Sequence, residues 1–174
     1  LYLKRLIIGG YDKVYEIAKK DKNVMLLTAD MGAISLDKFR EDLPEQYINV
    51  GVAEQNLISV SAGLALGGKK VYAYAIAAFL IYRAFDQIRI DICEMDLPVV
   101  LVGAGAGKSY KTEGATHWAM YDKWIVKFLP NIEICTPYNL REAEVIAQYS
   151  YECNHPIYVR LLKRGTYFKK GKGL

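Results

Sequence analysis

The segment Val99-Val100-Leu101-Val102 is apolar at every position, and this pattern limits the chain to a small set of folds. A strand with one face in water alternates apolar and polar residues, whereas a strand covered on both faces is apolar throughout. Strands of the second kind belong to parallel sheets with helices on both sides. The segment therefore predicts an α/β protein with a buried, mostly parallel sheet.

The hydrophobic pattern alternates between strand and helix along the chain. It predicts six strands, at Val24–Ala29, Gln46–Val50, Lys70–Ala75, Leu97–Gly103, Ile132–Thr136 and Ile157–Leu161. It predicts helices at about Tyr11–Lys20, Leu36–Asp42, Glu54–Leu66, Ala78–Glu94, Ala119–Phe128 and Leu140–Cys153. We expect one domain over residues 1–174, a three-layer αβα sandwich around a mostly parallel six-stranded sheet. The tail from about residue 165 is expected to be flexible.

Composition and charge argue against several classes of protein. A chain of 174 residues, 52% of them hydrophobic, is long enough to bury a core. The net charge of +4 is mild, and basic residues gather near the C-terminus at Lys163-Arg164 and 169–172. Such a run is typical of a solvated end, so we expect no nucleic-acid partner.

The cysteines and the apolar runs bear on location. Cys93, Cys135 and Cys153 leave one thiol unpaired in any disulfide scheme and form no Cys-x-x-Cys motif. We therefore expect reduced thiols in a cytoplasmic protein. The sequence shows no signal peptide and no apolar run of ~18 residues, so we expect no membrane span.

Glu54 stands where a short strand turns into an apolar helix. Gly51 permits the sharp turn, because glycine adopts backbone conformations that other residues avoid. In parallel α/β proteins, ligands bind at this carboxyl edge of the strands. Glu54 is therefore a candidate site residue, although the helix dipole also stabilises a carboxylate in the first turn of any helix.

Three further segments carry candidate site residues. Phe79, Tyr82 and Phe85 recur at positions i, i+3 and i+6 and share one helical face, a spacing that core residues also show. Asp30 follows the first strand. The sequence Glu113-Gly114-Ala115-Thr116-His117 lies in the connection after the fourth strand.

Together these segments resemble, over residues 10 to 162, the pyrimidine-binding domain of the transketolase family of thiamine diphosphate enzymes. They look closest to the short second subunit of split transketolases and more distantly like deoxyxylulose phosphate synthase. The resemblance implies that Glu54 is catalytic and hydrogen-bonds N1 of the cofactor's aminopyrimidine ring. It implies an aromatic pocket for that ring, formed by Phe79, Tyr82 and Phe85. Asp30 resembles an aspartate near the thiazolium side of the cofactor.

The resemblance also implies substrate contacts. Glu113 and His117 match residues that contact the sugar hydroxyls near the reacting carbon, and His117 is also expected to be catalytic. The family places an arginine after the last strand for the substrate phosphate, so Arg160, Lys163 and Arg164 are candidates. Lys163 holds the best-aligned position.

Two departures from the family pattern limit what this chain does alone. Gly105 and Ala106 stand where relatives carry a His or Arg for the sugar phosphate, which leaves a sugar or a sugar phosphate as substrate. Nothing resembles the Gly-Asp-Gly…Asn segment that binds the metal and the diphosphate. We therefore expect no metal site here.

The thiamine diphosphate would be shared with a diphosphate-binding subunit or domain that holds Mg²⁺ or Ca²⁺, in a homodimer or heterotetramer. The chain would be a natural short subunit or an excised domain.

The resemblance predicts transfer of a two-carbon ketol unit between sugars, active only with the partner. A synthase of the deoxyxylulose phosphate type, or another thiamine-dependent acyl transfer, is the alternative within enzymes. A non-catalytic binding or scaffold module of the same fold is the alternative of another class, and the joint presence of Glu54, Glu113 and His117 argues against it.

One motif points elsewhere. Gly103 to Ser109 ends in Gly-Lys-Ser like a nucleotide-binding phosphate loop, but that pattern requires a glycine where this chain has Val102. It also requires a helix at the Lys-Ser, whereas residues 110–114 read as irregular. We expect a mobile Gly-rich loop beside the cleft instead.

Overall fold

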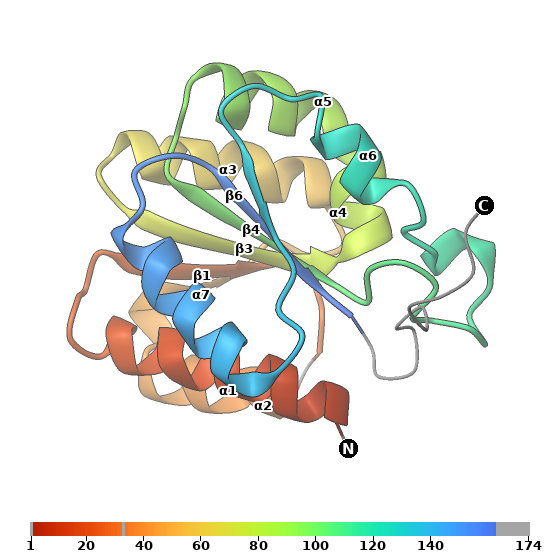
Figure 1. Cartoon of the computed structure of the whole chain (residues 1–174). Helices are drawn as coiled ribbons and strands as arrows, with labels where there is room; N and C mark the ends of the chain where they lie inside the picture. The colour runs from red at the N-terminus through yellow and green to blue at the C-terminus, as the bar shows by residue number, and fades with distance from the viewer. Residues whose placement is uncertain (1, 33, 163–174) are drawn as a thin grey trace.

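The computed structural model describes residues 2–32 and 34–162, which form a layered α/β structure (Figure 1). The six strands are β1 Val24–Thr28, β2 Tyr47–Asn49, β3 Lys70–Ile76, β4 Val99–Ala104, β5 Glu133–Cys135 and β6 Ile157–Leu161. They form one sheet in the order β2-β1-β3-β4-β6-β5, and every neighbouring pair is parallel. The predicted fold class is confirmed.

Helices cover both faces of this sheet. The α-helices are α1 Tyr2–Ala18, α2 Ile34–Asp42, α3 Glu54–Leu66, α4 Ala77–Arg83, α5 Phe85–Gln87, α6 Asp122–Val126 and α7 Leu140–Glu152. The shorter or wider turns are η1 Pro44–Gln46, the π-helix η2 Ile88–Glu94 and η3 Ala115–His117. Figure 1 shows α1, α2 and α7 on one face and α3 to α6 on the other.

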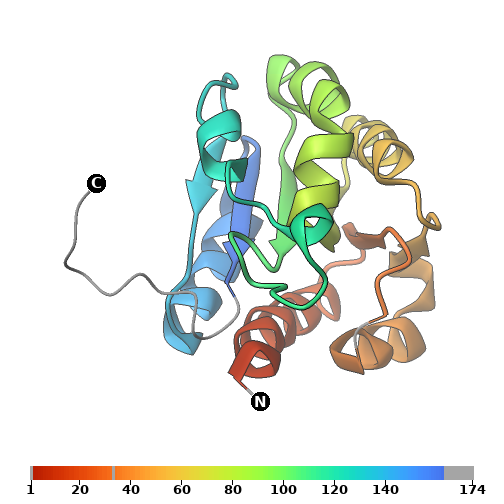
Figure 2. The ribbon, with the colours of Figure 1, turned by 90° about the vertical axis from the view of Figure 1, so that its right-hand side faces the viewer.

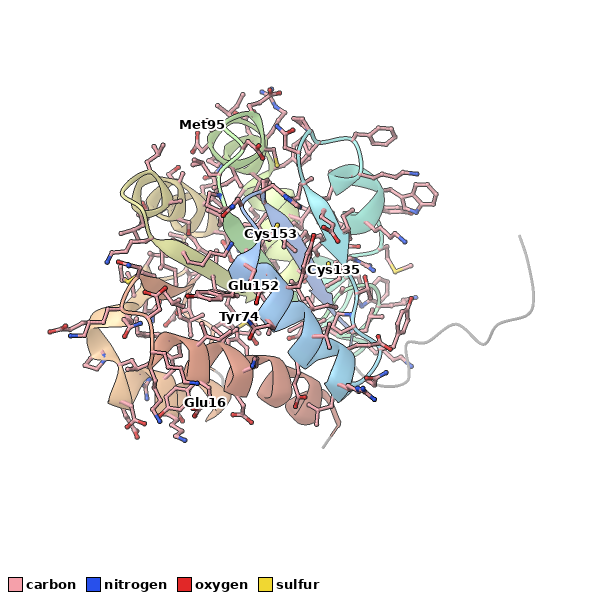
Figure 3. The ribbon with its side chains drawn as sticks, turned by 60° about the vertical axis from the view of Figure 1, so that its left-hand side comes forward. Glu16, Tyr74, Met95, Cys135, Glu152 and Cys153 are labelled. Carbon is pink, nitrogen blue, oxygen red and sulfur yellow. The ribbon has the colours of Figure 1, made fainter. Side chains whose placement is uncertain are left out.

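Alternate residues of the strands point to opposite faces of the sheet and pack into two separate hydrophobic cores. Ala73 and Leu101 pack toward α3 and η2, whereas Tyr72 and Val100 pack toward α1 and α7. Tyr74 of β3 lies on the α1 side, with its ring 5.1 Å from that of Tyr11 (Figure 3). Because both faces are buried, β4 must be apolar at every position, and this is the pattern from which the fold was predicted.

The cysteines follow the same two-sided arrangement. Cys93, Cys135 and Cys153 are free thiols. Cys93 lies in the core on the α3 side, and the other two lie on the α7 side (Figure 3). Along residues 2–32 and 34–162, no helix combines the length and the apolar character needed to cross a membrane.

Most predicted boundaries are close to those observed, and three differ. The predicted helix Ala78–Glu94 is three segments, because the backbone of Ala84 (φ −105°, ψ 22°) ends α4 and a π-helix follows α5. The predicted helix Ala119–Phe128 is shorter in the structure, where it is α6, Asp122–Val126. Ala119 is not helical, because its backbone forms a bridge with that of Gly107. The first helix begins well before Tyr11. The predicted tail lies outside the residues that the structure describes.

The connections after β1, β2, β3 and β4 all leave the sheet at one edge, which Figure 2 views from the front. From β1 the chain moves outward to β2 and then returns to β3 on the other side of β1. The strand order thus reverses between β1 and β3, and in open α/β sheets such a reversal opens a crevice at the carboxyl edge.

Gly103 of β4 tests how tightly the sheet and α4 are packed. A Cβ built on Gly103 would lie 2.8 Å from the Tyr158 ring and 3.0 Å from the Ala77 Cβ. We expect Gly103→Ala to lower the free energy of unfolding by about 1–3 kcal/mol, because overpacking shifts neighbours from their preferred positions. Gly63→Ala on α3 is the control, since nothing lies within 4 Å of its added Cβ, and it should stabilise by up to about 1 kcal/mol. Urea unfolding measures both, and equal effects would contradict the close packing.

Candidate functional site

Glu54 begins α3 directly after the turn that follows β2. Gly51 has φ +78°, a left-handed conformation that favours glycine, and its N–H donates to Asn49 Oδ1 at 3.0 Å. The turn is therefore fixed by both residues. The turn places the Glu54 side chain at the edge of the sheet where the strands end, and this side chain is only 6% exposed.

The Glu54 carboxylate is paired with Arg83, the last residue of α4. Arg83 Nη1 donates to both carboxylate oxygens at 3.3 Å, and the Arg83 side chain is 50% exposed. The guanidinium carbon also lies 3.7 Å from the centre of the Phe79 ring. The sequence prediction does not include Arg83, although its position four residues after Phe79 places it on the same helical face.

His117 reaches the same place from η3. Its ring lies 4.8 Å from that of Phe79 in an edge-on arrangement and 5.9 Å from that of Tyr110. Its Nδ1 lies 3.0 Å from Thr116 Oγ1. Glu54, Arg83, Phe79 and His117 thus form one continuous set of contacts, which we call the edge cluster. Three of its four members were predicted for one site from segments far apart in the sequence.

Tyr82 and Phe85 lie beside the edge cluster and face other neighbours. Tyr82 is 38% exposed, its hydroxyl accepts a hydrogen bond from the Tyr121 N–H at 2.9 Å, and burial raises its pKa. Phe85 packs against the core on the α3 side. The end of α4 separates the two, so Phe79, Tyr82 and Phe85 do not share one continuous helical face.

Asp30 lies at the neighbouring ends of β1 and β2. Its backbone is left-handed (φ +50°), its N–H donates to Asn49 Oδ1 at 2.9 Å, and its carboxylate accepts from Asn49 Nδ2 at 3.1 Å. It lines a cavity of about 80 Å³ together with Asn49, Tyr47 and Arg40. Asn49 therefore links Asp30 to the turn that carries Glu54.

The predicted substrate residues have different surroundings. Glu113 is exposed in the loop before η3 and accepts a hydrogen bond from Thr112 Oγ1 at 2.9 Å. Arg160 Nε and Nη2 donate to the two carboxylate oxygens of Asp122 at 2.7 and 2.8 Å. Lys163 and Arg164 lie outside the described residues, and their predicted role stays a prediction.

Asp122 joins α6 to β6 at the side of the site. It is fully buried, and besides Arg160 it accepts a hydrogen bond from the Tyr158 hydroxyl at 2.7 Å. Burial, followed by the Asp122 charge, raises the pKa of Tyr158 well above its ordinary value, so this hydroxyl stays a donor. In the sequence, an aspartate at the start of a helix indicates only a favourable interaction with the helix dipole. Asp122 is therefore absent from the predicted site.

The Gly-rich loop does not have the structure of a nucleotide-binding phosphate loop. No helix begins at Lys108-Ser109. The Lys108 ammonium lies 4.1 Å from the centre of the Trp118 ring, and Ser109 Oγ donates to the carbonyl of Ala106. Within residues 2–32 and 34–162, no group of three or more His, Cys, Asp or Glu side chains is placed to hold a metal ion.

Comparisons with known proteins give a consistent result. A profile described as "Transketolase, pyrimidine binding domain" matches residues 11–167. One of the subunits of apulose-4-phosphate transketolase from Phocaeicola vulgatus is 32% identical over 151 residues, 86% of this chain and 48% of that protein. 1-Deoxy-D-xylulose-5-phosphate synthase of Clostridium perfringens is 33% identical over 88% of this chain and 25% of that protein.

Among solved structures, one titled "Split gene transketolase, inactive beta4 tetramer" superimposes with a TM-score of 0.82 at 30% identity. The superposition covers 94% of this chain and 52% of the split-gene transketolase chain. The chain thus spans about half the length of these two transketolase relatives and about a quarter of the synthase.

The buried Asp122 carboxylate gives a direct test of this part of the site. We expect Asp122→Asn to lower the free energy of unfolding by about 3 kcal/mol, because it leaves the Arg160 charge buried without its partner. Asp37→Asn is the matched control, since Asp37 pairs with Arg40 at 3.1 Å on the surface. It should change stability by less than about 1 kcal/mol. Urea unfolding decides, and similar losses in both variants would contradict a structural role for the buried pair.

Proposed function

The chain belongs to the family of transketolase pyrimidine-binding domains, and we propose that, with a diphosphate-binding partner, it transfers a two-carbon ketol unit between sugars. The observation that carries this proposal is that the buried Glu54 carboxyl and the Phe79 ring both contact the Arg83 guanidinium, at the carboxyl edge of the sheet. A carboxyl and a flat aromatic face are the two groups that an aminopyrimidine ring needs for a hydrogen bond and a stacking contact.

The residues present fit the pyrimidine half of thiamine diphosphate. Glu54 is 6% exposed, so water competes little for its carboxyl, and the planar Arg83 guanidinium already lies against Glu54 and Phe79. A flat group with hydrogen-bonding nitrogens is therefore accommodated there. When bound, thiamine diphosphate supplies the carbon nucleophile that breaks and forms the carbon–carbon bond.

Each protein group has a limited task in this proposal. Glu54 holds a proton at N1 of the ring, Phe79 provides a stacking face and excludes water, and Tyr82 and Phe85 flank the pocket. Asp30, at the ends of β1 and β2, is proposed to face the thiazolium side of the cofactor. These tasks are orientation and electrostatics, which is what proteins supply to a reactive cofactor.

His117 and Glu113 are proposed to hold the sugar hydroxyls. His117 contacts Phe79, so a substrate next to the ring would meet this imidazole. We do not assign Arg160 to the substrate phosphate, because its Nε and Nη2 already donate to Asp122. Lys163 and Arg164 remain the candidates for that role.

We propose that the partner is a diphosphate-binding subunit or domain that holds Mg²⁺ or Ca²⁺. The Phocaeicola vulgatus relative is named as one subunit of a transketolase, and the solved structure as a split-gene transketolase whose beta4 tetramer is inactive. Both names fit an enzyme divided between chains. We infer an assembly with the site at the seam, either a homodimer of complete units or a heterotetramer.

A synthase of the deoxyxylulose phosphate type is the second candidate, favoured by the 33% identity to that enzyme of C. perfringens. The two reactions differ in the group at carbon 1 of the product. A 1-deoxy ketose carries a methyl group there, whereas ketol transfer leaves a hydroxymethyl group. Assaying the reconstituted enzyme with a sugar as donor of a ketol unit, and separately with a 2-keto acid as donor of an acyl unit, separates the candidates.

Glu54→Gln tests the catalytic carboxyl. In the enzyme reconstituted with its partner, we expect turnover to fall by roughly 100-fold or more, because glutamine cannot relay the proton. The circular dichroism spectrum should be unchanged. Glu41→Gln, at an exposed position on α2, should retain full activity. Turnover within about threefold of wild type for Glu54→Gln would remove Glu54 from the catalytic role.

Cofactor binding tests the division of the site. The chain alone should bind thiamine diphosphate weakly, since the diphosphate and its metal find no ligand set in the described residues. The affinity should rise sharply once the partner is added. Isothermal titration with magnesium present measures both states. Micromolar, magnesium-dependent binding to the chain alone would contradict the proposal of a shared site.

A further inference from the structure

Arg83 makes both of the contacts that the proposed function gives to the pyrimidine ring. Its Nη1 lies 3.3 Å from each Glu54 carboxylate oxygen, and its guanidinium carbon lies 3.7 Å from the Phe79 ring centre. A guanidinium is planar, stacks on aromatic faces and donates hydrogen bonds within its own plane. An aminopyrimidine ring shares these three properties.

The pairing has a clear physical cause. The Glu54 side chain is 6% exposed, and a buried carboxylate without a partner is costly. The hydrogen bonds described for this carboxylate come from Arg83. In the chain without its cofactor, the guanidinium therefore neutralises the carboxylate of a residue that the proposed active site requires at this position.

The same residue is able to leave. Arg83 is the last residue of α4, just before the backbone departs from helical geometry at Ala84. Its side chain is 50% exposed, so the guanidinium reaches water by rotating about its side-chain bonds. A half-exposed guanidinium loses little on returning to water, and the bound ring would take its place at the Glu54 carboxyl, so the exchange leaves no buried carboxylate without a partner.

We propose that Arg83 is an internal occupant of the pyrimidine subsite: it holds Glu54 and Phe79 in the free chain and is displaced when the aminopyrimidine ring binds. This inference rests on the proposed function. The two occupants require opposite protonation states, because the guanidinium needs the ionised carboxylate and the ring nitrogen N1 needs a carboxyl that donates.

Competition by Arg83 lowers the apparent affinity for the ring by the fraction of chains with an open subsite. The probe is 4-amino-5-hydroxymethyl-2-methylpyrimidine, which lacks the diphosphate and needs no metal. We expect Arg83→Ala to bind this probe roughly three- to tenfold more tightly than wild type. Adding Glu54→Gln to Arg83→Ala should abolish the gain.

Arg89→Ala is the matched control. It removes the same charge six residues further along the chain, where Arg89 pairs with Asp86 at 2.8 Å on the surface. Its affinity for the probe should equal that of wild type. A second measurement needs no variant: in ¹⁵N-arginine-labelled wild type, the Arg83 Nε signal should move on titration with the probe, while that of Arg89 stays in place.

The outcomes separate the inference from the proposed function. Equal or weaker binding by Arg83→Ala, or an unmoved Arg83 signal while wild type binds the probe, would overturn the inference and leave the proposed function intact. If neither wild type nor Arg83→Ala binds the probe up to about 10 mM, the pyrimidine role and the inference fall together.

Discussion

A parallel sheet that is buried on both faces is the constraint on which the rest of this structure depends. Parallel strands cannot be joined by tight turns, so each connection must cross the sheet and return. The four connections after β1 to β4 accordingly leave at one edge. Glu54, Phe79 and His117 follow three different strands and still meet there. The site is thus a consequence of the topology, and the side chains only have to be placed at the starts of the connections.

Two buried carboxylates stand at this edge, and their arginine partners differ in a way that matters. Asp122 is fully buried, and its partner Arg160 is only 12% exposed, so this pair is a permanent link between α6 and β6. Glu54 is nearly as buried, but Arg83 is half in water. An ion pair with one solvent-exposed partner can exchange that partner for a ligand. Opening an ion pair that is buried on both sides costs several kcal/mol of free energy. The same chemistry therefore serves structure at Asp122 and, under the proposed function, ligand binding at Glu54.

Much of the fold was predictable because it follows from local pattern. The bounds of β6 and α3 agree with those predicted, and the resemblance to the transketolase pyrimidine-binding domain is confirmed. The break at Ala84 was not predictable. A π-helix keeps Ile88 and Ile92 buried on one side, so the hydrophobic pattern reads as a continuous helix. Arg83 and Asp122 were absent from the predicted site because each acquires its role through a partner on another element, which no local spacing reveals.

The backbone hydrogen bonds between Gly107 and Ala119 affect how the loop between them can change in sequence and length. Each residue donates its N–H to the other's carbonyl, at 3.0 and 2.9 Å, so the ends of the intervening loop are held together. The loop carries Glu113 and His117 but is anchored independently of its own length. Because closing a longer loop costs little additional entropy, residues can be gained or lost between positions 108 and 118 without displacing β4 or α6. Under the proposed function, in which Glu113 and His117 hold the sugar hydroxyls, the substrate range can therefore change in this loop while the sheet and the Glu54 turn stay the same.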